Sequence, residues 1–90
     1  MTDNVQEIYQ EAYNLHYRHK QPEDSYFYYC YILKFFPDSK EAKYSLQQID
    51  NLQKSNVITS ELKKAVSDEL EKPREQIKTI RTHKKEVKKK

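Results

Sequence analysis

The chain has 90 residues, of which 34% are charged and none is glycine, and its formal net charge is +3. A chain of this length forms one small domain, and the lack of glycine excludes glycine-rich phosphate loops, dinucleotide fingerprints, EF-hand loops and nucleophile elbows, which need glycine where the backbone bends sharply. Most classes of small-molecule enzyme are thereby disfavoured, and turns without glycine favour a helical protein.

The cysteine content and the first residues point to the cytoplasm. Cys30 is the only cysteine, so the chain cannot form an internal disulfide. The first ten residues contain neither the basic nor the apolar segment of a secretion signal. The longest apolar run, residues 26–36, is shorter than the about 20 residues that a membrane-spanning helix needs. We therefore expect a cytoplasmic protein that has no contact with a membrane.

The first predicted helix begins after Asp3 or Asn4 and continues to about Lys20. Asn4 followed by Glu7 resembles a capping box, in which short polar side chains bond the free N–H groups of the first turn. Residues at intervals of three and four form the expected buried stripe of this helix: Val5, Ile8, Ala12, Leu15 and His19.

The second predicted helix begins at Pro22, because proline suits the first helical position. The aromatic run that follows also has strand propensity, but Pro37 after it and the lack of a strand partner or a hairpin glycine favour a helix. Its apolar residues lie nearly all round the helix. Either two neighbouring helices sandwich them, or some form an exposed interface for a partner or a second copy of the chain.

Two further helices are predicted. Asp38 or Ser39 caps a third helix that ends near residue 54, and Thr59 or Ser60 opens a fourth. The expected buried stripes are Ala42, Ser45, Leu46, Ile49 and Leu52 in the third helix and Leu62, Ala65, Val66 and Leu70 in the fourth. Positions 66, 70, 73, 77, 80, 84 and 87 continue a heptad-like spacing. This spacing indicates either a short coiled-coil seam or a solvated helix that restarts at Pro73.

The predicted division is therefore a helical domain over residues 1–72 and a charged helix or disordered tail over residues 73–90. Arg81 and five lysines against one glutamate make the last ten residues strongly basic. Such a segment is either a solvating tail or a salt-dependent nucleic-acid contact. The residues that would bind phosphates are Arg81, Lys84, Lys85, Lys88, Lys89 and Lys90.

A set of positions in the first three helices follows one repeating pattern. Its members are Tyr9, Asn14, Tyr17, Ser25, Tyr28, Tyr29, Leu33, Pro37, Asp38, Ala42, Tyr44 and Leu46. With this pattern residues 9–39 resemble one tetratricopeptide (TPR) repeat, and residues 40–53 resemble the first helix of the next. The resemblance implies an all-α fold, a TPR-like antiparallel helical hairpin with two further helices. It also implies a non-catalytic protein–protein interaction module.

The chain departs from this family at Tyr13. TPR helix pairs pack a small residue at the corresponding position of the first helix, so a bulky ring there is expected to widen or re-angle the hairpin. Lys20 and Gln21 stand where the family has a glycine-containing turn. A single repeat cannot bury both of its faces, so the later helices are expected to cap it, or else the chain self-associates.

The resemblance also implies a binding surface. The first helix of a TPR repeat lines a concave groove, which would place Gln10, Asn14, Tyr17 and Arg18 against a partner peptide. From the second helix, Tyr28 and Tyr31 are expected to contribute aromatic anchors. The alternative is an ordinary solvated helix face. The expected partner is another protein or peptide, or a second copy of the chain.

No catalytic, metal or cofactor site is predicted. His16 and His19 lie three residues apart on one helix, but no clear third ligand accompanies them, so packing accounts for them better than a metal does. Cys30 lies in an apolar run without a basic neighbour and is expected to be an unreactive buried thiol. The second predicted function is association with nucleic acid or the ribosome through the basic tail.

Overall fold

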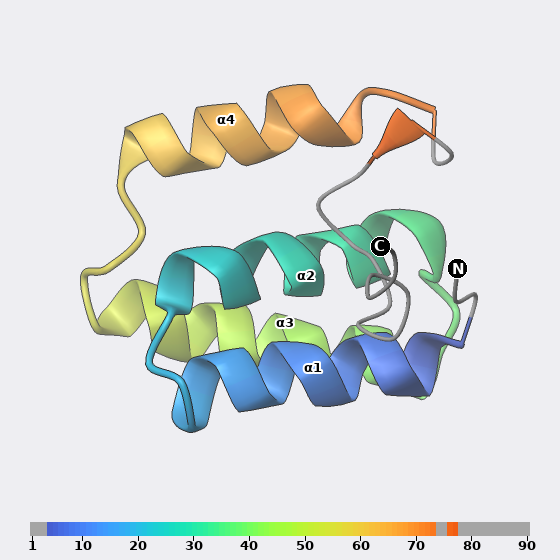
Figure 1. Ribbon diagram of the computed structural model, residues 1–90, viewed down its shortest axis with the longest axis horizontal. Coiled ribbons are helices and arrows are strands. Elements are labelled where there is room, and N and C mark those ends of the chain that lie inside the picture. The colour runs from blue at the N-terminus through green and yellow to red at the C-terminus, as the bar shows by residue number, and fades with distance from the viewer. Residues whose placement is uncertain (1–3, 74–75, 78–90) are drawn as a thin grey trace, which may run out of the picture.

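The computed structural model describes residues 4–73 and 76–77, and it places four helices in them. These helices are α1 (Val5–Tyr17), α2 (Pro22–Phe35), α3 (Lys40–Lys54) and α4 (Ser60–Leu70). Each helix runs antiparallel to the one before it (Figure 1). The described residues contain no strand, so the predicted all-α fold class is confirmed. None of the described helices has both the length and the apolar character needed to span a bilayer.

The predicted helix starts are confirmed by local hydrogen bonds. Asn4 Oδ1 accepts from the backbone N–H groups of Gln6 and Glu7, at 2.9 and 3.3 Å. Ser39 and Thr59 cap α3 and α4 in the same way, each accepting from the N–H group three residues later. Capping side chains in this position satisfy donors that the helix itself leaves unpaired. Three of the four starts are therefore encoded locally by one polar residue each.

The first helix is shorter than predicted. It ends at Tyr17 rather than near Lys20, because Lys20 adopts a left-handed conformation with φ of 57°. The Gln21 N–H donates to the Leu15 carbonyl oxygen at 2.8 Å, which closes the turn into α2. Asn56, with φ of 61°, takes the same conformation after α3. A chain without glycine thus uses a lysine and an asparagine where other proteins commonly place glycine.

Lys20→Gly is expected to raise the free energy of unfolding by about 1 kcal/mol, because glycine adopts the left-handed conformation without the steric cost that a Cβ imposes. Asn56→Gly is the matched control and should stabilise less, since asparagine tolerates this conformation well. Urea unfolding followed by circular dichroism measures both changes. A Lys20→Gly variant that is no more stable than the parent would show that the turn is not strained.

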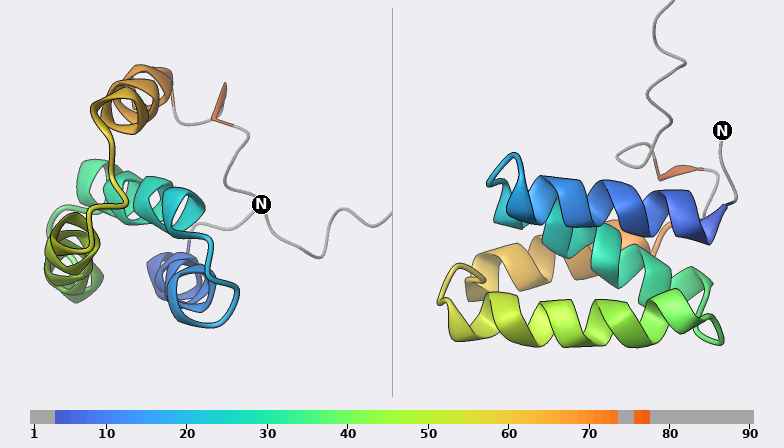
Figure 2. Two further views of the ribbon diagram at one scale, coloured as in Figure 1. Left: turned by 90° about the vertical axis from the view of Figure 1, so that its left-hand side faces the viewer. Right: turned by 90° about the horizontal axis from the view of Figure 1, so that it is seen from below.

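The helices form three layers, with α2 in the middle. Figure 2 shows α1 and α3 side by side on one side of α2 and α4 on the other. Helix α2 therefore buries side chains on both of its flanks: Tyr26, Phe27, Tyr29, Tyr31 and Ile32. The sequence left two roles open for this aromatic run, a core between two helices or an exposed interface. These five residues belong to the core and are not available to an intermolecular interface.

The predicted buried stripes are correct in part. Ile8, Ala12, Ala42, Ser45, Leu52, Val66 and Leu70 are buried as expected. Three predicted core positions are wrong, because His19, Leu46 and Ala65 are exposed, with Leu46 retaining 58% of its surface. His19 lies beyond the end of α1, and Leu46 and Ala65 lie at the edges of their stripes. Helical spacing alone does not show where a neighbouring helix stops covering a stripe.

Tyr13 does not lie at the buried helix crossing where the repeat resemblance placed it. Its ring is 41% exposed, whereas the neighbouring Ala12 is fully buried, as is Ser25 at the start of α2. The small buried residue of α1 is thus one position earlier than the resemblance predicted. The ring of Tyr13 is therefore not enclosed between α1 and α2.

The core extends past Pro73. Ile77 is only 6% exposed and belongs to the same apolar cluster as Val66 and Leu70. Positions 66, 70 and 77 of the proposed seam are thus used within the chain's own core. Pro73, the fourth described seam position, is exposed. Seam positions 80, 84 and 87 and the basic segment of residues 81–90 lie outside the described residues.

Candidate functional site

Three tyrosines of α1 form a row because they are spaced by four residues. Tyr9, Tyr13 and Tyr17 therefore share one face of the helix. The ring centroids of Tyr9 and Tyr13 are 6.2 Å apart, and those of Tyr13 and Tyr17 are 4.6 Å apart. Tyr44 of α3 continues the row across the helix pair, with its centroid 5.8 Å from that of Tyr9. Tilted pairs at these separations are favourable for aromatic rings.

Gln48 of α3 ties this row of rings to the neighbouring helix. The Tyr17 hydroxyl donates to Gln48 Oε1 at 2.6 Å, and Asn51 Nδ2 donates to the same oxygen at 3.3 Å. Burial raises the pKa of Tyr9, and a hydrogen bond with Gln48 partly offsets this effect. We call the surface formed by Tyr9, Tyr13, Tyr17, Tyr44 and Gln48 the tyrosine face. It joins α1 to α3 on the side of the molecule opposite α4.

The tyrosine face exposes large rings to solvent. Tyr13, Tyr17 and Tyr44 retain 41%, 42% and 49% of their surface, while Tyr9 is half-buried between them and the core. Tyr9 in turn contacts the fully buried Tyr29 of α2, with ring centroids 5.9 Å apart. Exposed rings that pack on a layer of further rings have little freedom to change their positions. The surface is therefore preorganised.

His16 supports the tyrosine face from inside. Its ring stacks on that of Tyr17 at 4.0 Å, and its Nδ1 lies 3.1 Å from the Tyr29 hydroxyl oxygen. Burial lowers the pKa of His16, which favours the neutral imidazole. His19 is exposed, and the described part of the chain brings no three His, Cys, Asp or Glu side chains together as a metal would need.

The site residues predicted from the sequence are found in different environments. Gln10 and Arg18 are exposed, and Gln10 Nε2 donates to Asn14 Oδ1 at 3.4 Å beside the tyrosine face. Tyr17 belongs to the face itself. Tyr28 is half-buried on α2 and is not part of the face.

Tyr31 requires a correction. It is only 4% exposed, because its ring packs against Phe27 and Phe35 within the core. In this position it cannot offer a surface to a partner. The residue type could not reveal this, because a tyrosine that anchors a partner and a tyrosine that is buried in the core look the same in the sequence.

Sequence reasoning missed Tyr13, Tyr44 and Gln48 as site residues. The four-residue spacing of Tyr9, Tyr13 and Tyr17 was a usable signal, because it places all three rings on one face. The contributions of Tyr44 and Gln48 depend on how α3 packs beside α1. No local pattern in the sequence shows this.

The half-buried Cys30 and the buried Tyr26 form a pair on α2. Burial raises the pKa of the Cys30 thiol to about 11, and a hydrogen bond with Tyr26 acts weakly in the opposite direction. Burial likewise raises the pKa of Tyr26 to about 12. A thiol must ionise to act as a nucleophile. Cys30 is therefore protonated and unreactive at neutral pH.

These shifts predict loss of stability at alkaline pH. A tyrosine or thiol with a raised folded-state pKa stabilises the protein fully below its unfolded-state pKa and loses this contribution as the pH rises. The free energy of unfolding should therefore fall from about pH 9 to about pH 12, because Cys30, Tyr26 and Tyr29 ionise in the unfolded chain before they ionise in the folded one.

Tyr26→Phe is the informative variant for this effect. Without the Tyr26 hydroxyl group, the free energy of unfolding should fall less steeply between about pH 10 and 12. Urea unfolding curves collected at each pH measure this change. Tyr44→Phe, at an exposed ring, serves as the control. Equal pH profiles for both variants and the parent would contradict the role assigned to burial.

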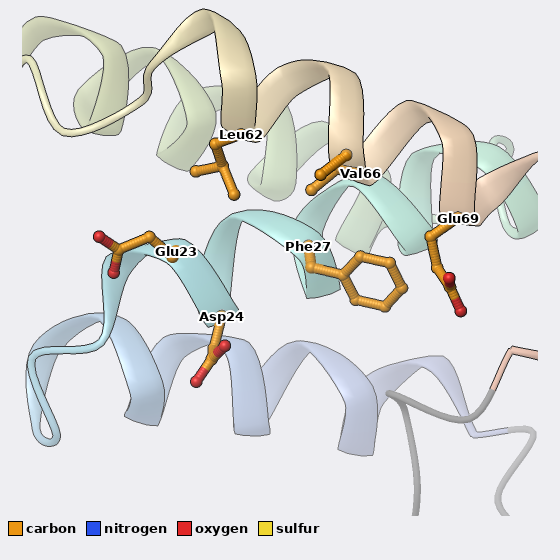
Figure 3. Close-up of a pocket in the computed structure, with 7 residues that line it drawn as sticks. Glu23, Asp24, Phe27, Leu62, Val66 and Glu69 are labelled. Atoms are coloured by element: carbon orange, nitrogen blue, oxygen red, sulfur yellow. The ribbon is translucent and has the colours of Figure 1, made fainter.

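Two pockets also lie among the described residues. One pocket, with a volume of about 230 Å³, lies between α2 and α4. Its lining includes the carboxylates of Glu23, Asp24 and Glu69 around Phe27 and Val66. Figure 3 shows these three carboxylates pointing in different directions, away from a common centre. Glu69 is also paired with Lys72 at 3.0 Å. The second pocket, of about 300 Å³, lies at the C-terminal end of α1, and its lining includes His16, Lys20 and Leu52. Neither pocket converges polar groups on a ligand.

Comparisons with known proteins do not identify this chain. Neither the protein-family models nor the curated proteins nor the solved structures give a match.

Proposed function

We propose that the protein is a non-catalytic, cytoplasmic protein–protein interaction module that binds a partner peptide or helix through the tyrosine face. The observation that carries this proposal is the exposure of Tyr13, Tyr17 and Tyr44 on one side of a domain whose other aromatic rings are largely buried. Tyrosine is enriched in the centres of protein interfaces because it offers a large, rigid contact area together with a hydroxyl group.

The position of the face fits a TPR-like module. Helices α1 and α3 lie side by side, as the first helices of successive repeats do in the family that the sequence resembles (Figure 2). In that arrangement Gln10, Asn14, Tyr17 and Arg18 border the partner, and Tyr13 and Tyr44 join them. The register of the resemblance needs one change, because Ala12 rather than Tyr13 is buried.

The titratable groups support a non-catalytic role. A nucleophile requires a lowered pKa or an adjacent base, whereas burial raises the pKa of the Cys30 thiol. The pKa of His16 is lowered by burial, and its Nδ1 lies 3.1 Å from the Tyr29 hydroxyl oxygen. The carboxylates of the α2–α4 pocket do not converge. These groups are arranged for packing rather than for proton transfer.

A quantitative affinity capture tests this proposal. The parent protein, a Tyr13→Ser/Tyr44→Ser variant and a Leu46→Ser control are each used as bait in lysate treated with nuclease. Leu46 is exposed on α3 but lies two residues from Tyr44, on the opposite side of the helix. We expect a stoichiometric protein partner with the parent and with Leu46→Ser, and at least tenfold less of it with the double variant. Equal recovery by all three baits would overturn the proposal.

A second candidate function rests on the charge distribution. Arg81, Lys84, Lys85, Lys88, Lys89 and Lys90 form a dense basic segment, which favours salt-dependent binding to nucleic-acid phosphates or ribosomes. Deleting residues 81–90 should then abolish binding to RNA or DNA in a filter-binding assay and leave capture through the tyrosine face intact. Unchanged nucleic-acid binding after the deletion would rule this candidate out.

A further inference from the structure

The pocket of about 230 Å³ between α2 and α4, which we call the acidic groove, has the composition of a docking site for a basic segment. We propose that residues 78–90 of the same chain dock in the acidic groove, which thereby withholds their basic side chains from external anions. This inference does not depend on the tyrosine face. It follows from the composition of the groove, from charge complementarity and from the position of Ile77.

The acidic groove has an apolar floor with carboxylates at both ends. Figure 3 shows Phe27, Leu62 and Val66 between Glu23 and Asp24 at one end and Glu69 at the other. No lysine, arginine or histidine side chain lines the groove. Its volume is below the roughly 300 Å³ at which small-molecule sites begin. The groove therefore suits the side chains of a peptide segment, and its separated carboxylates suit separate cations rather than one compact ligand.

The carboxylates of the acidic groove are available to further cations. Glu23 and Asp24 are exposed and form no ion pair with a described residue. Glu69 is paired with Lys72 at 3.0 Å, but the Lys72 side chain is 51% exposed. Surface pairs of this kind contribute little free energy. A basic segment thus gains attraction in the groove without breaking a strong ion pair.

Residues 78–90, which lie outside the described residues, complement the groove in charge and in pattern. They carry seven lysine and arginine side chains against one glutamate, whereas residues 4–73 carry eleven acidic side chains against nine lysines and arginines. Within the segment, Val87 has lysines on both sides, at positions 84, 85, 88 and 89. An apolar side chain between cations is the complement of an apolar floor between carboxylates.

The position of Ile77 brings the segment to the groove. Ile77 is buried in the same apolar core as Phe27 and Val66, which also line the groove. Residues 76–77 lie beside the C-terminal end of α4 (Figure 1). The thirteen residues that follow span up to about 40 Å when extended, and the 11 residues of α4 measure about 16 Å. The segment is therefore long enough to run back along α4 as far as Glu23.

Paramagnetic relaxation enhancement in the ¹⁵N-labelled full chain tests this inference. A nitroxide is attached at Lys90→Cys in a Cys30→Ser background, and circular dichroism verifies that this background is folded. We expect the nitroxide to broaden the amide signals of Leu62 and Val66 at least threefold more than that of Tyr44 on the tyrosine face. Equal broadening of the groove and the tyrosine face would overturn the inference.

Neutral variants separate a charge contact from chance proximity. The groove variant, Glu23→Gln/Asp24→Asn/Glu69→Gln, should reduce the broadening at Leu62 and Val66 at least threefold. The control variant, Glu11→Gln/Asp38→Asn/Asp50→Asn, changes the net charge equally outside the groove and should behave like the parent. In 1 M NaCl, where the Debye length is about 3 Å, the segment should also be released. Broadening that persists in the groove variant and in salt would contradict docking by charge.

Two further measurements distinguish the occupant and its effect. When ¹⁵N-labelled chain without nitroxide is mixed with nitroxide-bearing chain without ¹⁵N, we expect no broadening of the groove signals. Broadening as large as that within one chain would overturn the inference and assign the groove to the segment of a second copy. On immobilised heparin, the groove variant should elute at higher salt than the equally charged control variant. Elution of both at the same salt concentration would show that the groove does not withhold the segment from anions.

Discussion

Replacing Tyr29 with alanine is expected to lower the free energy of unfolding by about 3–5 kcal/mol, the usual cost of removing a fully buried aromatic ring. Tyr29 has no exposed surface and lies where the central helix α2 meets α1. Its ring contacts Tyr9 and His16, and its hydroxyl group lies 3.1 Å from His16 Nδ1. Its removal therefore leaves both a cavity and an unsupported tyrosine face.

Urea unfolding followed by circular dichroism measures this change, and Tyr44→Ala is the matched control. Tyr44 is also a tyrosine in contact with Tyr9, but it is 49% exposed. Its replacement should cost less than about 1 kcal/mol, as is usual for surface positions. Similar losses for the two variants would contradict the assignment of Tyr29 to the core and Tyr44 to the surface.

The second large effect is expected at Ile77. Ile77→Ala should lower the free energy of unfolding by about 2–4 kcal/mol, because it truncates a buried isoleucine side chain in the apolar core to which Val66 and Leu70 also belong. Val66 and Leu70 are the buried residues of α4, so α4 has little other buried apolar surface to hold it on the core. The loss should appear as earlier opening of α4 in amide hydrogen exchange.

Gln76→Ala provides the control for Ile77→Ala. Gln76 is the preceding residue and is exposed, so its substitution should change stability by less than about 0.5 kcal/mol. If Ile77→Ala has an equally small effect, the chain after Pro73 does not contribute to the folded core, and the helical domain ends where the sequence pattern suggested, at residue 72.

The sequence predicted the helices well because their starts are local. Asn4, Pro22, Ser39 and Thr59 each mark a helix start through a cap or a fixed φ angle, and these effects need no information about the rest of the chain. The end of α1 was less predictable. Lys20 adopts a left-handed conformation that lysine does not favour, so the residue type did not predict that the helix ends before it.

The candidate site was harder to predict because it depends on how helices pack. Tyr13, Tyr29, Tyr31 and Tyr44 are the same residue type, but only contacts between helices leave two of them exposed and bury the others. Leu46 illustrates the same limit, since it is apolar and helical yet no neighbouring helix covers it. The arrangement of α2 between its neighbours decides these outcomes.

The central claim is that a partner protein docks on the tyrosine face. Site-specific photo-crosslinking in cells tests this claim most directly. A photoreactive phenylalanine derivative is placed at position 44 and, as the control, at position 46 on the same helix. The account predicts covalent adducts with another protein from position 44 and none from position 46. Adducts of equal yield from both positions, or from position 46 alone, would contradict it.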